Sequence, residues 1–225
     1  MADFLTQYGP LFLQGFGTTL ILSVAGFVLG FALGVPISFA KTFGSGPLKW
    51  LAAGYVEVIR GTPMLVQLFI IYYSLPQVGI NLDALTASIV ALGLNSAAYQ
   101  AEYFRGAMRS VPAGQMEAAL SVGMTRIGSI MSVVFPQSLR LVIPAWTNEL
   151  VYLVQYSSIA YLVTVEELTG VGTLIGSRTF QYVTVYGIIA LIYLATTLAI
   201  VRGSRILERR YAIPGLSASS AGRSI

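Results

Sequence analysis

The 225-residue sequence contains no cysteine and no histidine. Without thiols and imidazoles, the chain cannot form disulfides, bind a metal through Cys or His ligands, or use a thiolate or an imidazole in catalysis. A covalent lipid anchor on cysteine is excluded for the same reason. We therefore expect neither a catalytic site nor a metal site on this chain.

Lysine is also scarce, and its positions exclude ATP hydrolysis by this chain. A phosphate-binding P-loop requires Gly-Lys-Ser or Gly-Lys-Thr, because the lysine ammonium must reach the phosphates. The two lysines, Lys41 and Lys49, stand in "AKT" and "LKW". We expect no cofactor on this chain, and an ATP-driven process would require a separate subunit that holds ATP and Mg.

Charged residues make up only 10% of the sequence, whereas apolar residues make up 56%. Soluble domains carry about 25% charged residues, so the sequence predicts an all-α integral membrane protein. Its single transmembrane domain covers residues 1–216, and a disordered Ser- and Ala-rich tail covers 217–225. Most of the five apolar stretches approach the ~20 residues that cross a bilayer; they are roughly 11–40, 63–75, 84–104, 141–163 and 182–201.

The second stretch is too short to cross a bilayer by itself. The amphipathic run Leu48–Arg60 precedes it. A helix of this kind suits the interface between lipid and water. We expect this run to lie at the interface and to lead into the second span.

The basic residues predict the orientation of the chain. Cytoplasmic loops retain Lys and Arg, and only Arg178 falls on the side opposite to the other twelve of the thirteen basic residues. The N-terminus is therefore expected outside, and the C-terminus and the loop 108–137 inside. The net charge of +4 needs no nucleic acid to explain it, because these cations set the topology and meet anionic lipid headgroups. The twelve are Lys41, Lys49, Arg60, Arg105, Arg109, Arg126, Arg140, Arg202, Arg205, Arg209, Arg210 and Arg223.

Small residues mark one face of the first span. Gly26, Gly30 and Gly34 recur every four residues, so they lie on one helix face where a second helix can approach closely. We expect this face to be a helix-packing surface.

The loop 108–137 contains a polar helix between two apolar stretches. Pro112 suits the first turn of a helix, Gln115–Leu120 are good helix formers, and Gly123 suits its C-terminal end. A second helix is expected from about Thr125 to Phe135. Helices of this length are unstable alone in water, so the first one must dock on another surface, which the small side chains of Ala118 and Ala119 would allow to come close.

The same loop resembles the EAA loop of ATP-binding cassette importer permeases. In that family the pattern is Glu-Ala-Ala, three residues, Gly, nine residues, then Ile-x-Leu-Pro. Here Glu117-Ala118-Ala119 is followed by Gly123 and then by Val133-Val134-Phe135-Pro136 with the same spacing. The resemblance implies a type I importer core in which Glu117, Ala118, Ala119, Gly123 and Pro136 belong to the segment that couples to the ATPase.

Three further segments resemble the polar amino-acid branch of these permeases, and the likeness extends from about Leu11 to Tyr211. One departure is Gln155-Tyr156-Ser157-Ser158, where that branch often has Lys and then Asp or Ser. The resemblance implies an ATPase dimer, a second permease subunit that is identical or similar, an extracytoplasmic amino-acid-binding protein, and a prokaryotic cytoplasmic membrane. The segments are Tyr55–Phe69, Ala97–Ala119 and Asn148–Leu168.

Two carboxylates, Glu102 and Glu149, fall inside predicted spans. A charge at the centre of a membrane helix costs about 2.5–3.5 kcal/mol, so each should face protein or water rather than lipid. Glu102 has Arg105 three residues later and is equally well explained as an intrahelical ion pair. Glu149 lies near the middle of its span, where a binding role is favoured over pairing with an arginine of a neighbouring helix.

Helical spacing places polar side chains beside these carboxylates. Asn95, Tyr99 and Glu102 recur at i, i+4 and i+7, and either Asn148 or Glu149 stacks with Tyr152. Two such faces on adjacent helices would enclose an amino acid, with a carboxylate binding its α-amino group or a cationic side chain. The predicted substrate-binding residues are Asn95, Tyr99, Glu102, Asn148, Glu149 and Tyr152.

The sequence therefore predicts the permease subunit of an ATP-driven importer that moves a polar or basic amino acid by alternating access. The same architecture for a quaternary amine would require an aromatic cage, and an organic acid would require a cationic pocket. An ion-coupled secondary transporter would show inverted repeats and broken helices. A purely structural subunit would leave Glu149 without a use.

Overall fold

The computed structural model describes residues 2–211, which form helices and no strands. The expected tail, 217–225, lies outside the described residues. The α-helices are α1 (Ala2–Phe43), α2 (Gly46–Arg60), α3 (Met64–Phe69), α4 (Ala84–Ser110), α5 (Ala113–Ser121), α6 (Arg126–Ser129), α7 (Phe135–Leu141), α8 (Ile143–Tyr156), α9 (Leu168–Thr179) and α10 (Tyr182–Tyr211). Short π- or 3-10-helical segments extend α3, α6 and α8; they are Ile70–Ser74, Leu75–Val78, Ile130–Val134 and Ser157–Val163.

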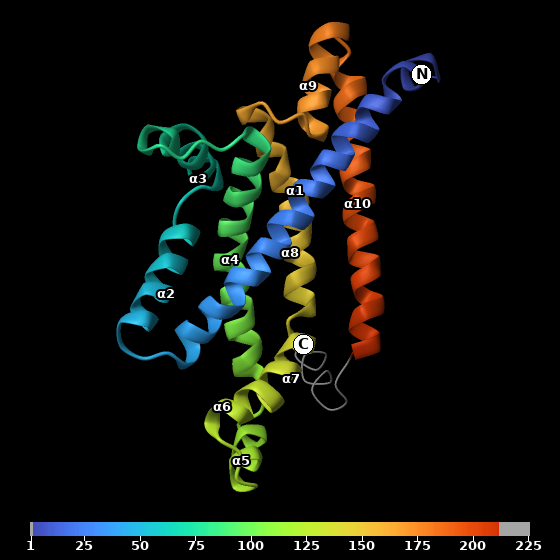
Figure 1. Cartoon of the computed structure of the whole chain (residues 1–225). Helices are drawn as coiled ribbons and strands as arrows, with labels where there is room; N and C mark the ends of the chain where they lie inside the picture. Colours follow the sequence, from blue (N-terminus) through green and yellow to red (C-terminus); the bar gives the residue numbers. More distant parts are fainter. Residues whose placement is uncertain (1, 212–225) are drawn as a thin grey trace.

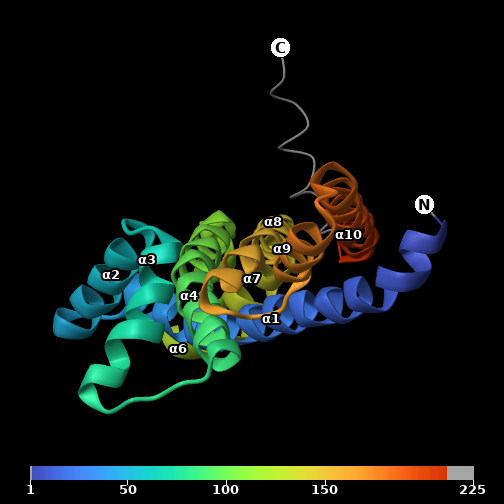
Figure 2. The same cartoon turned by 90° about the horizontal axis from the view of Figure 1, so that it is seen from above.

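The long helices form a layer that α1 crosses obliquely. In Figure 1, α2, α4, α8 and α10 run roughly side by side, and Figure 2 shows α1 extending along one face of them. The start of α1 and α9 lie at one end of the molecule, whereas α5 and α6 project from the other end. The predicted coupling segment therefore lies at one end, in α5 and α6. The polar positions of α4 and α8, where the solute is expected, lie between the two ends.

The glycine face of α1 packs against α4, as its spacing predicts. A Cβ added at Gly30 would lie 2.5 Å from Ser96 Oγ, and one at Gly34 would lie 2.9 Å from the carbonyl oxygen of Ala97. Gly26 meets Leu92 in the same way, at 3.0 Å from its Cβ. Any side chain at Gly30 or Gly34 would therefore push the two helices apart, so the expectation of close helix packing is confirmed.

An aromatic cluster joins four helices below this contact. The fully buried ring of Phe104 lies 5.3 Å from the ring of Trp146 on α8, and Phe31 of α1 lies 5.3 Å from the same indole. Phe135 of α7 contacts Phe104 at 6.2 Å. Edge-on aromatic contacts of this kind fix relative ring positions, so the cluster holds α4 and α8 in register with α1.

Within residues 2–211, the helices α1 and α10 are long and apolar enough to cross a membrane. Two bent helix pairs also pass this test, so the number of spans rises to four if each pair is counted as one span. The first pair is Gly46–Arg60 with Met64–Val78, bent by 105°, and the second is Arg126–Leu141 with Ile143–Val163, bent by 55°. The 27-residue α4 lies outside this group. Its buried polar residues, such as Ser96 and Gln100, face protein and lower its hydropathy.

The first bent pair differs from the expected arrangement. The run Leu48–Arg60 was expected to lie at the interface and lead into a span at 63–75. Instead, α2 stands beside α4 (Figure 1), and the segment Met64–Val78 turns away from it by 105°. The Gly61-Thr62-Pro63 turn makes this bend possible, because proline disfavours helical geometry at the residue before it.

Two carboxylates cap helices on the side of the molecule where α1 begins. Asp83 caps α4, and its side chain accepts hydrogen bonds from the hydroxyl and the backbone N–H of Thr86. These hydrogen bonds lower the pKa of Asp83 below its ordinary value. The segment 164–181 on the same side of the molecule contains the helix α9.

Glu167 is the second capping carboxylate, and it is fully buried. It accepts hydrogen bonds from the backbone N–H groups of Thr169 and Gly170 at the start of α9, and from the hydroxyls of Thr19 on α1 and Tyr193 on α10. Burial raises the pKa of Glu167, and these hydrogen bonds oppose that shift. The carboxylate thus ties three helices together at the end opposite to α5.

Candidate functional site

A cavity of about 350 Å³ lies between α4 and α8. It contains four of the six predicted substrate-binding residues. Four tyrosines form most of its wall, and Leu153 is the only aliphatic side chain among the described residues that line it. The lining residues are Asn95, Tyr99 and Tyr103 from α4 and Glu149, Tyr152, Leu153 and Tyr156 from α8.

Glu149 is the buried acidic group of this cavity, with 4% of its surface exposed. Its carboxylate accepts hydrogen bonds from the hydroxyls of Ser96 and Tyr103 on α4. Neither partner carries a positive charge, and no salt bridge to Glu149 is found within residues 2–211. A buried carboxylate held only by hydroxyls retains strong attraction for a cationic ligand. The alternative, in which Glu149 pairs with an arginine of a neighbouring helix, is absent from these contacts.

Arg60 supplies a positive charge beside the same cavity. Its guanidinium carbon lies 5.0 Å from the centroid of the Tyr99 ring, a cation–π distance. Arg60 also lies close enough to Tyr103 to act on it electrostatically. The sequence placed Arg60 with the cytoplasmic basic residues and gave it no role in the solute site. The packing of α2 along α4 brings Arg60, at the C-terminal end of α2, to these tyrosines.

Two predicted substrate-binding residues lie elsewhere. Asn148 is exposed and does not line the cavity, although its neighbour Glu149 does. Successive residues on a helix point about 100° apart, so only one of this pair can face α4. The structure selects Glu149.

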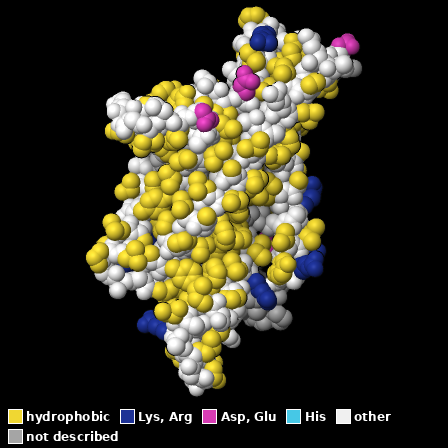
Figure 3. Space-filling model, in the orientation of Figure 1, with side chains coloured by type: hydrophobic (Ala, Val, Ile, Leu, Met, Phe, Trp, Pro, Cys, Tyr) yellow, Lys and Arg dark blue, Asp and Glu magenta, His cyan; other side chains and the backbone are white. Residues whose placement is uncertain are grey.

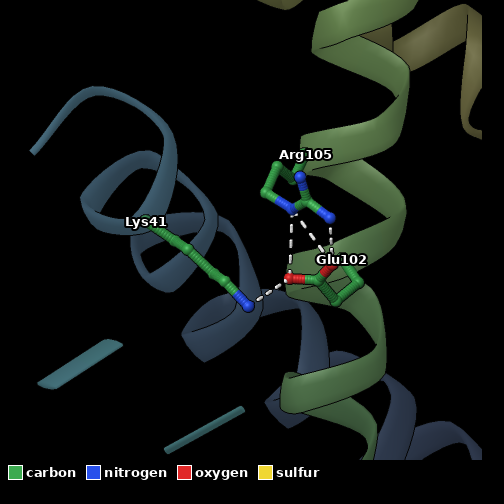
Figure 4. A network of polar contacts seen from close by, with 3 residues as sticks. All are labelled: Lys41, Glu102 and Arg105. Carbon is green, nitrogen blue, oxygen red and sulfur yellow. Dashed lines mark hydrogen bonds and ion pairs between the residues drawn. The ribbon is translucent and has the colours of Figure 1, made fainter. Parts of the chain in front are cut away.

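Glu102 forms a separate ion-pair cluster, drawn in Figure 4. Its carboxylate lies 2.8 Å from Lys41 Nζ of α1 and also binds Arg105 one turn further along α4. The side chains of Lys41 and Glu102 are only 18% and 13% exposed. Two cations neutralise Glu102: Arg105 forms the intrahelical pair that the sequence left open, and Lys41 links α4 to α1.

A larger cavity of about 560 Å³ lies between α8 and α10. Its walls are almost wholly apolar, with residues such as Leu139, Leu150 and Leu207. It therefore offers little to hold a polar solute, and the cavity at Glu149 is the better candidate. No group of three acidic side chains that would hold a metal is present in the described part of the chain.

The predicted coupling segment projects from the molecule as α5 and α6. Glu117 and Ala118 are exposed on α5, whereas Ala119 is 6% exposed and faces the protein. Gly123 has φ +86°, and the N–H of the next residue, Met124, bonds back to the carbonyl of Ala119. Only glycine adopts this left-handed conformation readily, which explains its place after α5.

The surface of this segment is apolar as well as exposed. Val122 and Ile127 are 79% and 75% exposed beside the turn at Gly123. Pro136, which ends the motif, is exposed near the start of α7. In Figure 3 the tip at the foot of the molecule is mainly uncharged, and hydrophobic side chains lie on it. Exposed apolar side chains on a short helix are typical of a surface that docks another protein.

Charge is distributed unevenly between the two ends. On the face drawn in Figure 3, the acidic side chains lie toward the end that carries α9, and most basic side chains lie toward the end that carries α5. The distribution of charge on this face agrees with the asymmetric distribution of basic residues predicted from the sequence.

An all-helical permease, with a polar cavity between core helices and a projecting helix at one end, is the class of protein that this fold and site define. Residues 26–213 match the model of the family described as the binding-protein-dependent transport system inner membrane component. The chain belongs to this family and has the type I ATP-binding cassette importer permease fold.

Curated relatives are similar over most of their length. The probable amino-acid ABC transporter permease protein YckA of Bacillus subtilis is 40% identical over 203 residues, which are 90% of each chain. The glutamine transport system permease protein GlnP of Escherichia coli is 36% identical and covers 91% of this chain and 94% of its own.

Solved structures agree with this assignment. A crystal structure of an amino acid ABC transporter with histidines has a TM-score of 0.86 at 39% identity, and covers 92% of this chain and 96% of its own. An inward-facing methionine transporter, MetNI, has a TM-score of 0.81 at 23% identity, covers 92% of this chain and 99% of its own, and shows the shared fold alone.

Proposed function

We propose that this chain is the membrane-spanning subunit of an importer for a polar α-amino acid. The observation that carries the proposal is the cavity that Glu149 and the tyrosines line, with Arg60 next to it over the Tyr99 ring. The relatives named above as amino-acid or glutamine permeases support the solute class. A permease of this family does not hydrolyse ATP itself, and the separate ATPase holds the nucleotide and its Mg.

The two charges match the two ends of an α-amino acid. The ammonium group of the solute binds Glu149, whose partners are only hydroxyls. The α-carboxylate binds Arg60, whose guanidinium can form two parallel hydrogen bonds with it. Asn95, Tyr99 and Tyr152 line the remaining wall. A solute with both charges satisfies both sides of the cavity, whereas a simple amine or acid satisfies one.

We propose that the chain crosses the membrane five times, with the N-terminus outside and the C-terminus inside. α1, α10 and the two bent pairs provide four crossings. The fifth is α4, since 27 residues span about 40 Å, enough for a bilayer core. The position of α5 at the end opposite to the start of α1 (Figure 1) supports a cytoplasmic coupling segment. Bacterial relatives support the prokaryotic cytoplasmic membrane as the location.

Transport then proceeds by alternating access. α5 docks on the ATPase through the exposed face around Glu117, Ala118 and Val122. Closure of the ATPase dimer moves the coupling helices of the two permease subunits together and opens the cavity to the outside. An extracytoplasmic binding protein supplies the amino acid, which leaves to the cytoplasm when the ATPase reopens. A second permease subunit, identical or similar, completes the pathway across a two-fold axis.

A quaternary amine is the second candidate solute. Four tyrosines line the cavity, and aromatic rings bind quaternary ammonium groups by cation–π attraction. This candidate uses Glu149 and the rings but offers Asn95 no donor, because a quaternary ammonium has no N–H group.

The test is uptake by proteoliposomes that contain this chain, its ATPase and its binding protein. Radiolabelled arginine, histidine, glutamine, glutamate and glycine betaine are compared, with and without ATP and with and without the ATPase. ATP-dependent uptake of one or more of the four amino acids is the expected result. Uptake of betaine alone would favour the second candidate, and uptake without the ATPase would overturn the importer proposal.

A further inference from the structure

The amide group of Gln67 links the bend after α2 to the cavity. Gln67 lies on α3 and is 8% exposed, although it does not line the cavity itself. Its side chain bonds to the turn that follows Arg60 on one side and to Asn95 on the other. It is therefore the only side chain described here that contacts both the Arg60 turn and a polar residue of the cavity wall through hydrogen bonds.

The turn fixes which end of the Gln67 amide is the donor. Gln67 Nε2 lies 2.7 Å from the carbonyl oxygen of Ile59, 3.1 Å from that of Thr62 and 2.9 Å from Thr62 Oγ1. The Thr62 hydroxyl already donates to the carbonyl of Val58 at 2.8 Å, so it accepts from Gln67. All three neighbours are acceptors, and the reversed amide would place Oε1 against two carbonyl oxygens.

This orientation determines the orientation of Asn95 in turn. Gln67 Oε1 faces Asn95, so Asn95 must present its NH₂ group, and its Nδ2 donates at 2.9 Å. The Oδ1 of Asn95 is then the amide atom left for the cavity, which Asn95 lines. Together, Asn95 Oδ1 and the Glu149 carboxylate give the cavity two groups that accept hydrogen bonds, whichever solute is present.

We propose that Gln67 is a positioning residue that sets the hydrogen-bond polarity of the solute site. By holding Asn95 as an acceptor, Gln67 makes the cavity select solutes that carry N–H donors. The inference rests on the proposed function and deepens it, because it requires a primary ammonium, amide or guanidinium group on the solute and disfavours quaternary amines.

Steady-state uptake by the complete transporter tests this relay. The probe is radiolabelled glutamine, or whichever amino acid of the panel above the wild type carries best. Gln67→Met keeps the shape of the side chain but removes both the Nε2 donor to the turn and the Oε1 acceptor for Asn95. We expect KM to rise about tenfold, the effect of one misoriented hydrogen bond, with the maximal rate per assembled transporter retained.

Rescue distinguishes positioning from a general structural role. Asn95→Asp supplies a carboxylate, which is an acceptor toward the cavity in either orientation and no longer needs Gln67. In the Gln67→Met background it should return KM to within about threefold of wild type. In the wild-type background the same change should raise KM, since it places a carboxylate oxygen against Gln67 Oε1.

Two further variants complete the design. Gln67→Glu in its protonated form still donates to the turn and accepts from Asn95, so KM should stay within about threefold of wild type. Thr62→Val removes one of three acceptors and should have a smaller effect than Gln67→Met.

The result that overturns the proposal is an assembled Gln67→Met transporter with unchanged KM, or with a raised KM that Asn95→Asp does not lower. If Gln67→Met does not assemble, Asn95→Asp alone decides, and an unchanged or lower KM would contradict the proposal. Absence of wild-type uptake of every amino acid would instead defeat the proposed function.

Discussion

The cavity between α4 and α8 and the ion-paired end of α4 each contain one carboxylate, and the two differ in their partners. Glu149 is held by the hydroxyls of Ser96 and Tyr103, whereas Glu102 is held by Lys41 and Arg105 (Figure 4). Both residues lie in predicted spans, where an uncompensated charge is costly. The comparison teaches that a membrane carboxylate is available to a ligand only when its neighbours leave its charge uncompensated.

The largest effect is expected at Glu149. Glu149→Gln removes the charge while keeping the shape, so the solute ammonium loses a charge-assisted hydrogen bond. We expect kcat/KM for uptake to fall about 100-fold. Co-purification of the ATPase should be unchanged, because α5 lies at the far end of α4. A variant that retains wild-type uptake would show that Glu149 is structural and would remove the difference between the two regions.

A smaller effect, on stability rather than uptake, is expected at Glu102. Glu102→Gln leaves Lys41 and Arg105 close together without their counter-charge, which should cost about 1 kcal/mol of unfolding free energy for this partly exposed cluster. Thermal unfolding of the purified permease measures the loss. Adding Lys41→Gln should recover part of it, since one unpaired cation is removed. A change in KM without a change in stability would mean that Glu102 belongs to the solute pathway after all.

The smallest effect is expected at Asp83, a carboxylate outside both regions. Its hydrogen bonds from Thr86 lower its pKa. The ionised side chain therefore stabilises the fold above the ordinary Asp pKa, and this contribution is lost as pH falls through the lowered value. Asp83→Ala should slightly lower the Tm at pH 7, and the difference from wild type should shrink toward pH 3. A difference that grows with acidification would contradict this sign.

Local spacing predicted the contacts that depend on one helix or one turn. The intervals between Gly26, Gly30 and Gly34 predicted the packing of α1 on another helix. The helix from Pro112 to Gly123 follows from its flanking residues in the same way. Each of these features is decided by neighbours within about one turn, so the sequence contains the required information.

Contacts between distant segments were harder to predict. Arg60 reaches Tyr99 because α2 packs along α4, and no pattern near Arg60 specifies that pairing. Glu102 looked like a binding residue by its spacing from Asn95, but Lys41 of α1 decides its role. The sequence signal that existed was Gly61-Thr62-Pro63, a helix-breaking turn directly after an arginine.

The walls of the cavity differ in stiffness, and this difference has a mechanical consequence. α4 is unbroken from Asn95 to Ser110, which is about 22 Å of helix, and α5 begins three residues later. Tilting this rod by about 10° around Asn95 would displace its far end by about 4 Å. The opposite wall is jointed at Val142, where α7 and α8 meet at 55°. A displacement of the coupling segment would therefore tilt α4 as a rigid rod, whereas at the other wall it would change the angle between α7 and α8.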